Sequence, residues 1–355
     1  MVTPHIIKEK RKIVIAVTGL NAIDSPGPGV AVIRSIKEYA DLDVRIIGLS
    51  YEALEPGIYM HELVDKTYQI PYPSVGLESL LQRLRQIHRI EKIDLVIPNF
   101  DAELFSFIKL RNELENMGIR SFLPDLDQFE ARHKTFLSKF GKKHQMMVPE
   151  DRIINHASDL PKAAAELDYP MVVKGKFYDA TIVHTLEDAR KAFYQLQAKW
   201  GLPVIAQQFI NGTEINIAAL GDGKGNTISV IPMRKLYITD KGKAWAGITI
   251  EDASYIELAK KFVKITKWRG GCELEIMQTA DGVSYIMEVN PRFPAWIYLT
   301  AAAGQNQPAT LVKMAMGEHV EPFQTYEVGK MFIRYSWDLI TDVSEFQKIS
   351  GEGEL

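Results

Sequence analysis

The sequence contains a single cysteine, Cys272, among its 355 residues, so the chain cannot form an internal disulfide. One cysteine fits a reducing compartment, and we expect the protein to be cytoplasmic. No stretch approaches the roughly 18 uninterrupted apolar residues of a membrane-spanning helix. Residues 1–12 are charged and polar, without an apolar run after them. These absences argue against export and against membrane insertion.

Charge is nearly balanced, with 42 Lys and Arg against 45 Asp and Glu and a formal net charge of −3. The chain lacks the basic excess that nucleic acid or an anionic membrane surface attracts, and we expect neither as a main partner. Internal repeats and low-complexity segments are also missing. A chain of this length can form two or three domains with apolar cores.

A hairpin in the last third of the chain is the clearest local pattern. Residues 272–278 and 284–290 are both strand-like, and the link between them ends in Asp281-Gly282. Asp-Gly is the strongest short-range signal for a hairpin. If Asp281 and Gly282 form a two-residue loop, the register of the two strands follows.

This register places Glu275 opposite Glu288, and Glu273 opposite Asn290, on one face of the hairpin, because opposed residues share a face. The other face is apolar and consists of Leu274, Ile276, Met287 and Val289. Like charges directly across a ladder cost roughly 0.2–1 kcal/mol, so Glu275 and Glu288 call for a cation. Their hard oxygen atoms favour Mg²⁺ bound together with phosphates. A solvated sheet face is the alternative.

The first 125 residues alternate between short apolar runs and helical patterns. Strand-like runs occupy 12–19, 44–49, 67–70, 93–98 and 118–124, and helical spacing occupies 30–39, 77–90 and 102–117. The alternation predicts an α/β domain with a three-layer parallel sheet. Ligands of such sheets lie beyond the carboxyl ends of the strands, so Asp101 is a candidate substrate residue, with helix capping as the alternative.

Residues 126–202 predict a smaller α+β unit. Helices are expected at 127–140 and 186–200, and strands at 147–154, 171–175 and 181–184. Lys174 and Lys176 end one of these strands beside Gly175. They either extend into solvent or hold phosphates as point charges.

Residues 203–355 predict a larger unit that contains the hairpin. Further strands are expected at 203–210, 215–220, 227–232 and 331–335, and helices at 254–268 and 301–316. Residues 350–355 lack apolar anchors, so we expect this end to be frayed, or ordered only by a partner.

The polar residues of these units together resemble the ATP-grasp superfamily. The resemblance is carried by Lys134, Lys174, Gln207-Gln208-Phe209-Ile210, Gly212-x-Glu214, Glu275 and Glu288-x-Asn290-x-Arg292. It is closest to the branch of carbamoyl-phosphate synthase large subunit, biotin carboxylase and related carboxylate–amine ligases. It implies a Rossmann-like pre-ATP-grasp domain at 1–125, and then a two-lobed ATP-grasp domain with a small lobe at 126–202 and a large lobe at 203–355.

The resemblance also implies a role for each matching residue. Glu275, Glu288 and Asn290 would bind Mg²⁺, and Lys134, Lys174 and Lys176 would contact the phosphates of ATP. Gln207, Gln208, Phe209 and Ile210 would offer backbone groups to the adenine edge, and Glu214 would bind the ribose. Met277 would pack on the adenine ring, with a place in the apolar core as the alternative. Arg292 and Lys174 would act in catalysis, with an ion pair to a glutamate as the alternative for Arg292. Substrate determinants would be Asp101, Arg234, Lys235, Arg292 and the 291–298 stretch.

The implied activity is an ATP- and Mg²⁺-dependent ligase that joins a carboxylate, of an amino acid or a peptide, to an amine through an acylphosphate. Such proteins commonly form homodimers through the first domain. The stretch after Lys174 is short and has one glycine, where related enzymes have a glycine-rich flap. This departure favours one alternative, a catalytically weak ATP-binding subunit that acts on a partner protein through the C-terminal segment. An NAD-dependent enzyme using the Gly27–Gly29 loop is a further alternative, although the glycines lack GxGxxG spacing.

Overall fold

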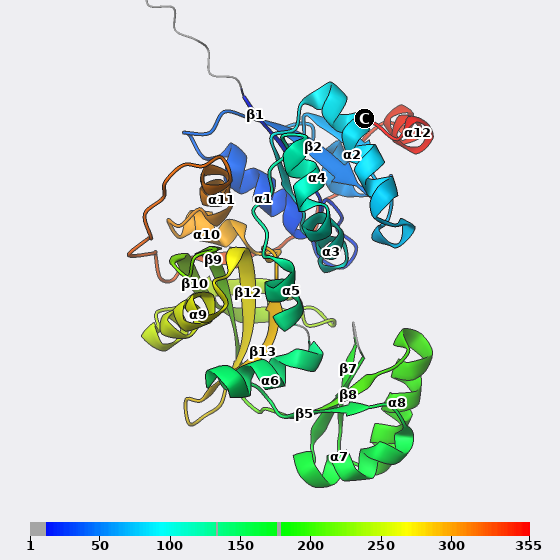
Figure 1. The fold of residues 1–355 in the computed structure, drawn as a ribbon, viewed down its shortest axis with the longest axis vertical. Coiled ribbons are helices and arrows are strands. Elements are labelled where there is room, and N and C mark those ends of the chain that lie inside the picture. Colours follow the sequence, from blue (N-terminus) through cyan, green and yellow to red (C-terminus); the bar gives the residue numbers. More distant parts are fainter. Residues whose placement is uncertain (1–11, 133, 176–178) are drawn as a thin grey trace, which may run out of the picture.

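The computed structural model describes residues 12–132, 134–175 and 179–355, and contains three β-sheets (Figure 1). The first is a four-stranded sheet with the order β3-β2-β1-β4. Its strands are β1 (Ile13–Val17), β2 (Val44–Ser50), β3 (Lys66–Gln69) and β4 (Leu95–Ile97). Its neighbouring strands all pair in parallel, as the sequence predicts. The expected fifth strand at 118–124 is wrong, because Arg120 forms only an isolated bridge to Leu95.

Helices cover both faces of the parallel sheet. Apolar residues of α1 (Pro28–Lys37) pack with Ile15 and Val17 on one face. Those of α2 (Leu77–Glu91) and α3 (Asp101–Lys109) pack with Val14 and Ala16 on the other, because side chains of a strand alternate. The remaining helical segments here are η1 (Pro56–Tyr59), η2 (Pro73–Val75) and α4 (Arg111–Asn116). The helix expected at 102–117 is thus divided at Leu110.

The second sheet has four strands in the order β5-β8-β6-β7 and lies far from the parallel sheet in Figure 1. Its strands are β5 (Asp151–Ile154), β6 (Met171–Lys174), β7 (Ala180–Val183) and β8 (Val204–Gln208). The helices are η3 (Ala157–Asp159), α7 (Leu160–Leu167) and α8 (Leu186–Trp200), and α5 (Leu126–Ala131) and α6 (Lys134–His144) precede the sheet. Because β8 pairs with β5 and β6, this sheet extends past the boundary expected at residue 202.

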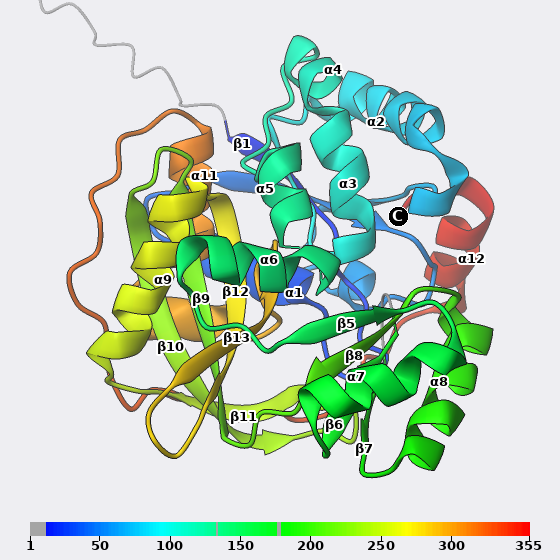
Figure 2. The ribbon, with the colours of Figure 1, turned by 60° about the horizontal axis from the view of Figure 1, so that its bottom comes forward.

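The third sheet has six strands in the order β13-β12-β9-β10-β11-β14. Its strands are β9 (Thr213–Asp222), β10 (Thr227–Ile238), β11 (Ala244–Thr249), β12 (Arg269–Gln278), β13 (Ser284–Asn290) and β14 (Met331–Ile333). Helix α9 (Ala253–Thr266) packs along β9 and β10 (Figure 2). Helices α10 (Tyr298–Ala302) and α11 (Gln307–Ala315) pack against α1, which joins this sheet to the first unit.

The hairpin β12–β13 has the predicted register at Glu273 and Glu275 but not at its turn. Thr279 N–H donates to the Val283 carbonyl, so Ala280, Asp281 and Gly282 form the loop, with Gly282 at a φ of 84°. A β-bulge at Met287 then shifts the register by one residue. Glu275 therefore opposes Glu288, and Glu273 opposes Asn290, as predicted. Ile286, rather than Met287, opposes Ile276.

The end of the chain is ordered in the structure, contrary to the sequence-based expectation. Residues Val343–Glu352 form α12, which lies beside the first unit (Figure 1). Its Ile349 is fully buried in the core cluster of that unit. The backbone of Leu355 then exchanges hydrogen bonds with Thr67 next to β3. Contacts with the first unit therefore order the C-terminal segment.

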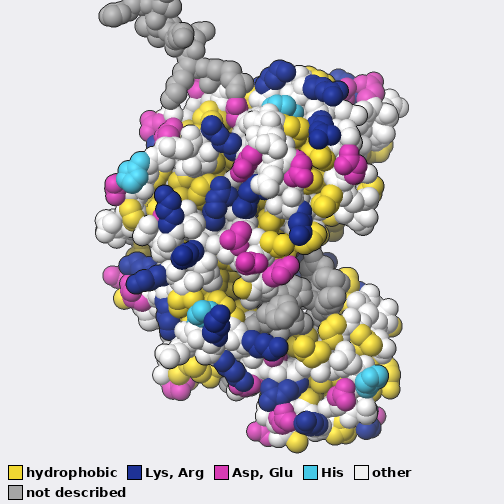
Figure 3. All heavy atoms as spheres, in the orientation of Figure 1, with side chains coloured by type: hydrophobic (Ala, Val, Ile, Leu, Met, Phe, Trp, Pro, Cys, Tyr) yellow, Lys and Arg dark blue, Asp and Glu magenta, His cyan; other side chains and the backbone are white. Residues whose placement is uncertain are grey.

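The surface carries charged side chains of both signs. Figure 3 shows Lys and Arg side chains interspersed with Asp and Glu on one face. Among the helices that the structure describes, none has the length and apolar character needed to cross a membrane.

Candidate active site

A cleft of about 810 Å³ lies between the carboxyl ends of the parallel strands and the third sheet. It is lined by residues that are remote in sequence, from the loop after β1 to Arg334 after β14. Six predicted site residues line it, namely Asp101, Glu214, Lys235, Glu275, Asn290 and Arg292. Strand ends and the β12–β13 hairpin thus bring together side chains that the sequence separates.

Glu273 is a buried carboxylate of the cleft that accepts hydrogen bonds from three neighbouring side chains. It is 5% exposed and accepts hydrogen bonds from Asn216 Nδ2 at 2.8 Å and from Trp296 Nε1 at 2.7 Å. Asn290 Nδ2 donates to its second oxygen at 3.0 Å. Both oxygens of Glu273 are therefore engaged, which suits a positioning residue better than a metal ligand.

The amide of Asn290 is oriented by two carboxylates. Its Nδ2 donates to Glu273 Oε2 and to Glu275 Oε1, each at 3.0 Å. With the nitrogen held in this way, the amide oxygen is left to accept a cation or a donor. Burial, together with the nearby charges of Glu273 and Glu288, raises the pKa of Glu275 to about 8. A divalent cation bound here would favour the ionised form of these carboxylates.

The donor set fits Mg²⁺. Among the residues described, no three His, Cys, Asp or Glu side chains form a metal cage. Mg²⁺ does not require one, since it usually takes one or two carboxylates and completes its shell with water and phosphate oxygens. The opposed pair Glu275 and Glu288, with the amide oxygen of Asn290, supplies such a set on one hairpin.

Arg292, which follows β13, is paired across the cleft with Asp101 at the start of α3. Its Nε and Nη2 donate to Asp101 Oδ2 at 3.2 and 3.0 Å, and its Nη1 donates to the Phe293 carbonyl. The nearby carboxylates, first among them Asp101, raise the pKa of Arg292, so the guanidinium stays charged. The N-cap of α3 is Phe100, so the alternative of Asp101 as the cap is wrong.

Lys235 and Glu214 form an ion pair between neighbouring strands β10 and β9. The resemblance predicts that Glu214 binds ribose and that Lys235 binds substrate. In the structure the two side chains form an ion pair with each other. Lys235 Nζ also donates to the Gly242 carbonyl at 3.1 Å. The nearby carboxylates of Glu275 and Glu214 raise the pKa of Lys235, so it remains a cation beside the hairpin.

Arg234 lies outside the cleft, contrary to its expected place among the substrate residues. It follows Met233 on β10 and precedes Lys235, and successive side chains of a strand point to opposite faces. Its charge acts on Tyr255 of α9, which covers the other face of the sheet. Alternation on one strand thus separates two adjacent basic residues.

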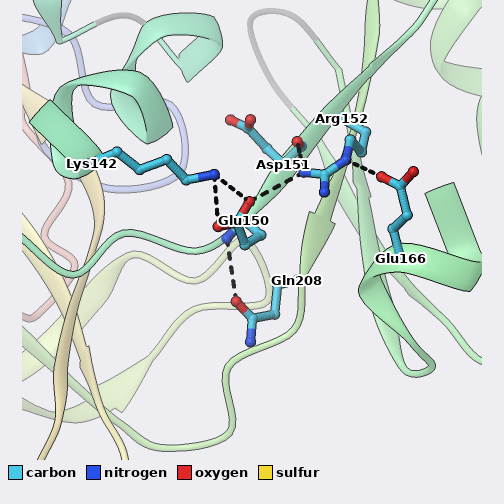
Figure 4. Close-up of polar contacts among 6 residues, drawn as sticks. All are labelled: Lys142, Glu150, Asp151, Arg152, Glu166 and Gln208. Atoms are coloured by element: carbon cyan, nitrogen blue, oxygen red, sulfur yellow. Dashed lines mark hydrogen bonds and ion pairs between the residues drawn. The ribbon is translucent and has the colours of Figure 1, made fainter.

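Four of the residues expected at the adenine, at positions 207–210, lie in or directly after β8 of the second sheet, and none of them lines this cleft. Gln207 is buried in β8, and Gln208 ends that strand. The Gln208 N–H donates to the Glu150 carbonyl at 2.8 Å, and its side chain accepts from Glu150 N–H (Figure 4). Phe209 and Ile210 follow the strand. The backbone N–H of Gln208 is therefore already engaged within the second sheet.

An ionic chain ties this end of the second sheet to α6. Lys142 lies 2.9 Å from Glu150, Glu150 contacts Arg152, and Arg152 contacts Glu166 on α7 (Figure 4). Each pair is partly exposed, so its contribution to stability is small.

The remaining predicted residues are distributed over three elements. Lys174 ends β6, and Met277 on β12 is opposed by Tyr285 and by Glu214. Lys134 is the first residue of α6, and its side chain lies outside the described part of the structure. Lys176 lies outside the described residues as well.

Several residues of the cleft escape sequence reasoning. Asn216 lies two residues after Glu214 on the same strand and so shares its face, a spacing that could have predicted its place in the cleft. Its Oδ1 has no partner in the described structure. Trp296 lies in the 291–298 stretch, but its bond to Glu273 cannot be read from spacing. Arg334 directly follows β14, and its guanidinium donates to the carbonyls of Ala244 and Ala295. Burial lowers the pKa of Arg334.

Comparison with known sequences identifies the chain's relatives. The family described as ATP-grasp in the biosynthetic pathway with Ter operon matches residues 202–333. The D-alanine–D-alanine ligase of Cupriavidus metallidurans is 26% identical over 179 residues, which cover 45% of this chain and 54% of the ligase. The carbamoyl phosphate synthase large chain of Neisseria meningitidis serogroup B is 24% identical over 202 residues, which cover 52% of this chain and 18% of the synthase chain. The chain thus spans about half the length of the first relative.

Comparison with solved structures extends the likeness to most of the chain. The biotin carboxylase domain of Hydrogenobacter thermophilus 2-oxoglutarate carboxylase matches with a TM-score of 0.69 at 17% identity, covering 88% of this chain and 71% of that one. It is described as a dimer in complex with MgADP and bicarbonate. The mixed α/β fold and the predicted resemblance to the ATP-grasp superfamily are confirmed.

Proposed function

Because the chain resembles ATP-grasp ligases in sequence and shares their fold, we propose that it is an ATP- and Mg²⁺-dependent carboxylate–amine ligase that releases ADP and phosphate. The observation that carries the proposal is the hairpin that sets Glu275 against Glu288, in which Glu275, Asn290 and the following Arg292 line the cleft. This arrangement supplies two carboxylates, an amide oxygen and a guanidinium at one place.

The second and third sheets are proposed as the two lobes that enclose ATP. Lys174, at the end of β6, is assigned to the phosphates together with Lys134 and Lys176. Because the segment 207–210 connects β8 of the second sheet to β9 of the third, we assign Phe209 and Ile210 to the adenine edge. Met277 and Glu214, which are opposed in the sheet, are assigned to adenine and ribose.

The chain's own residues would neutralise charge at the reacting centre. Glu275, Glu288 and the amide oxygen of Asn290 would hold Mg²⁺, which supplies electrostatic stabilisation of the transferred phosphoryl group when bound. Arg292 and Lys235 add fixed positive charge beside it. A carboxylate that attacks the γ-phosphate is itself an anion, so such positioned cations lower the barrier.

The first product of this chemistry is an acylphosphate, which an amine then attacks while phosphate leaves. We assign the carboxylate to an amino acid or a peptide, because the cleft of about 810 Å³ is far larger than bicarbonate requires. The ligase among the relatives is named for joining two amino acids, which agrees with this assignment. We further propose a cytoplasmic homodimer, in line with the dimer of the structural relative.

A hydroxylamine-trapping assay tests this function. The protein is incubated with ATP, Mg²⁺, hydroxylamine and pools of amino acids and short peptides, and ADP and hydroxamate are measured. Hydroxamate that depends on ATP, Mg²⁺ and one pool supports the proposal, and dividing the pool names the carboxylate. ADP release without hydroxamate from any carboxylate would contradict it.

A further inference from the structure

The end of the cleft formed by the first unit has a chemistry of its own. It is lined by Tyr51, Glu52 and Glu55 from the segment after β2, by Tyr72 after β3, and by Phe100 before α3. Two of these residues are glutamates and three are aromatic. Neither the ATP site nor the hairpin site proposed above uses any of them.

Glu55 is a buried carboxylate with one unpartnered oxygen. It is 5% exposed, and its Oε1 accepts from the backbone N–H groups of Tyr51 at 2.7 Å and of Glu52 at 3.2 Å. Its Oε2 has no hydrogen-bond partner in the described structure. A buried carboxylate oxygen without a donor is costly, so the site is complete only when a donor is supplied.

The charged side chains that act most strongly on Glu55 are themselves glutamates, Glu103 and Glu52. Glu52 lies in the same segment, and Glu103 of α3 is buried behind it, where it accepts from Thr18 and Tyr51. None of these three glutamates makes an ion pair with a described residue. Asp101, by contrast, is already paired with Arg292. Burial raises the pKa of Glu55 to about 7, as expected of a carboxylate that lacks a cation.

The aromatic rings give this end the walls of a cation site. Tyr51 and Tyr72 are stacked with ring centroids 5.4 Å apart, and Phe100 lies 6.0 Å from Tyr51. The hydroxyl of Tyr72 donates to Glu52 Oε1 at 2.6 Å, which fixes both side chains. Aromatic faces next to carboxylates attract an ammonium group and offer nothing to a phosphate.

We propose that this end of the cleft binds the ammonium group of an amino-bearing substrate, with Glu55 as its main anionic partner and Tyr51 and Tyr72 as its walls. The inference rests on the proposed ligase function and narrows it, because it excludes carboxylates and phosphates as the group held here. Arg292, Lys235 and Arg334 lie in the other part of the same cleft and suit the carboxylate that is activated. The substrate class is thus a zwitterion, an amino acid or a peptide, that lies along the cleft.

Binding measurements with matched compounds test the proposal. The probes are the standard L-amino acids, β-alanine and simple dipeptides, each compared with the acid that has hydrogen in place of the amino group. Binding is measured by calorimetry, with and without MgADP. The variants are Glu55→Gln, whose amide oxygen can still accept from Tyr51 and Glu52, and Glu52→Gln at the exposed rim. Glu62→Gln, which is exposed and outside the cleft, is the control.

The proposal predicts that at least one amino-bearing probe binds the wild type about tenfold more tightly than its partner without the amino group. Glu55→Gln should remove this preference, Glu52→Gln should weaken it about threefold, and Glu62→Gln should leave it intact. Equal binding of both partners, an unchanged preference in Glu55→Gln, or no binding of any amino-bearing probe would overturn it. Binding of MgADP distinguishes failure of the ammonium site from failure of the ligase function. A protein that does not bind MgADP would count against the ligase function itself.

Discussion

Arg292 and Asp101 join the two sides of the cleft through a single carboxylate oxygen. The guanidinium reaches Oδ2 with both Nε and Nη2, while Asp101 Oδ1, although buried, has no partner in the described structure. One residue begins a helix of the parallel-sheet unit, and the other follows the hairpin of the third sheet. The orientation of the proposed catalytic arginine therefore depends on the first unit.

Replacing Asp101 by Asn is expected to lower kcat about tenfold and to leave the KM for ATP within about twofold. Asn has the same size but lacks the charge, and hydrogen bonds between charged partners are about twice as strong as neutral ones. A loss of about 1.4 kcal/mol in the transition state corresponds to tenfold in rate. Steady-state kinetics, with the exposed Asp41→Asn as control, measure the effect. A change confined to the KM for ATP would contradict the role assigned to Arg292.

Replacing Glu288 by Gln should reduce turnover at least about a hundredfold while the protein stays folded. The substitution removes one of the two opposed carboxylates on which the metal assignment depends, and electrostatic stabilisation of this kind is worth about 10²–10³ in kcat. Turnover is measured over a range of Mg²⁺ concentrations, and folding by thermal unfolding. Glu257→Gln on the exposed face of α9 is the matched control. Wild-type activity in Glu288→Gln would rule out the metal assignment.

The buried carboxyl of Glu55 predicts a pH dependence of stability. Its pKa is about 7 in the folded protein, against an ordinary value of 4.5. Between these values the unfolded chain releases the proton while the folded protein keeps it, so stability falls as pH rises through this window and is constant outside it. Relative to Glu55→Gln, the wild type should lose up to about 3 kcal/mol between pH 4.5 and 7.5.

Urea unfolding of the two proteins at several pH values measures this difference. The other buried glutamates, such as Glu103, titrate in both proteins, so their effect largely cancels in the comparison. A difference that is flat, or that grows in favour of the wild type as pH rises, would show that Glu55 is not the buried acid described above.

The C-terminal helix is expected to contribute to the stability of the first unit. Ile349 is fully buried there, so Ile349→Ala removes apolar contacts and should lower the free energy of unfolding by about 2–4 kcal/mol. Ile340 lies nearby in sequence and is 89% exposed, which makes Ile340→Ala a matched control with little expected effect. Equal stability of the two variants in chemical unfolding would contradict the packing of α12.

The sequence predicts much of this architecture because the signals are local. Short apolar runs alternating with helical spacing were enough to place β1 to β4, and the Asp-Gly turn was enough to oppose Glu275 and Glu288. The correct register nevertheless depends on two features that the pattern does not contain, a longer loop and a compensating bulge at Met287. The carboxylate pair was predicted although the turn was not.

What the sequence could not predict depends on contacts between distant segments. The pairing of Arg292 with Asp101 joins residues 191 positions apart, and the burial of Ile349 depends on a surface made by the first unit. Arg234 and Lys235 look alike in sequence, and only the sheet shows that they lie on opposite faces. Glu55 carries no motif, because its character comes from burial and from an unpartnered oxygen.

The most direct test of the central claim follows an oxygen atom. Once the carboxylate substrate is known, it is prepared with ¹⁸O in both carboxyl positions and incubated with ATP, Mg²⁺ and the amine, and the released phosphate is analysed by mass spectrometry. If the carboxylate attacks the γ-phosphate and the amine then displaces phosphate, each phosphate carries one ¹⁸O from the substrate. Unlabelled phosphate, released together with product, would contradict the acylphosphate route and the ligase mechanism proposed for this chain.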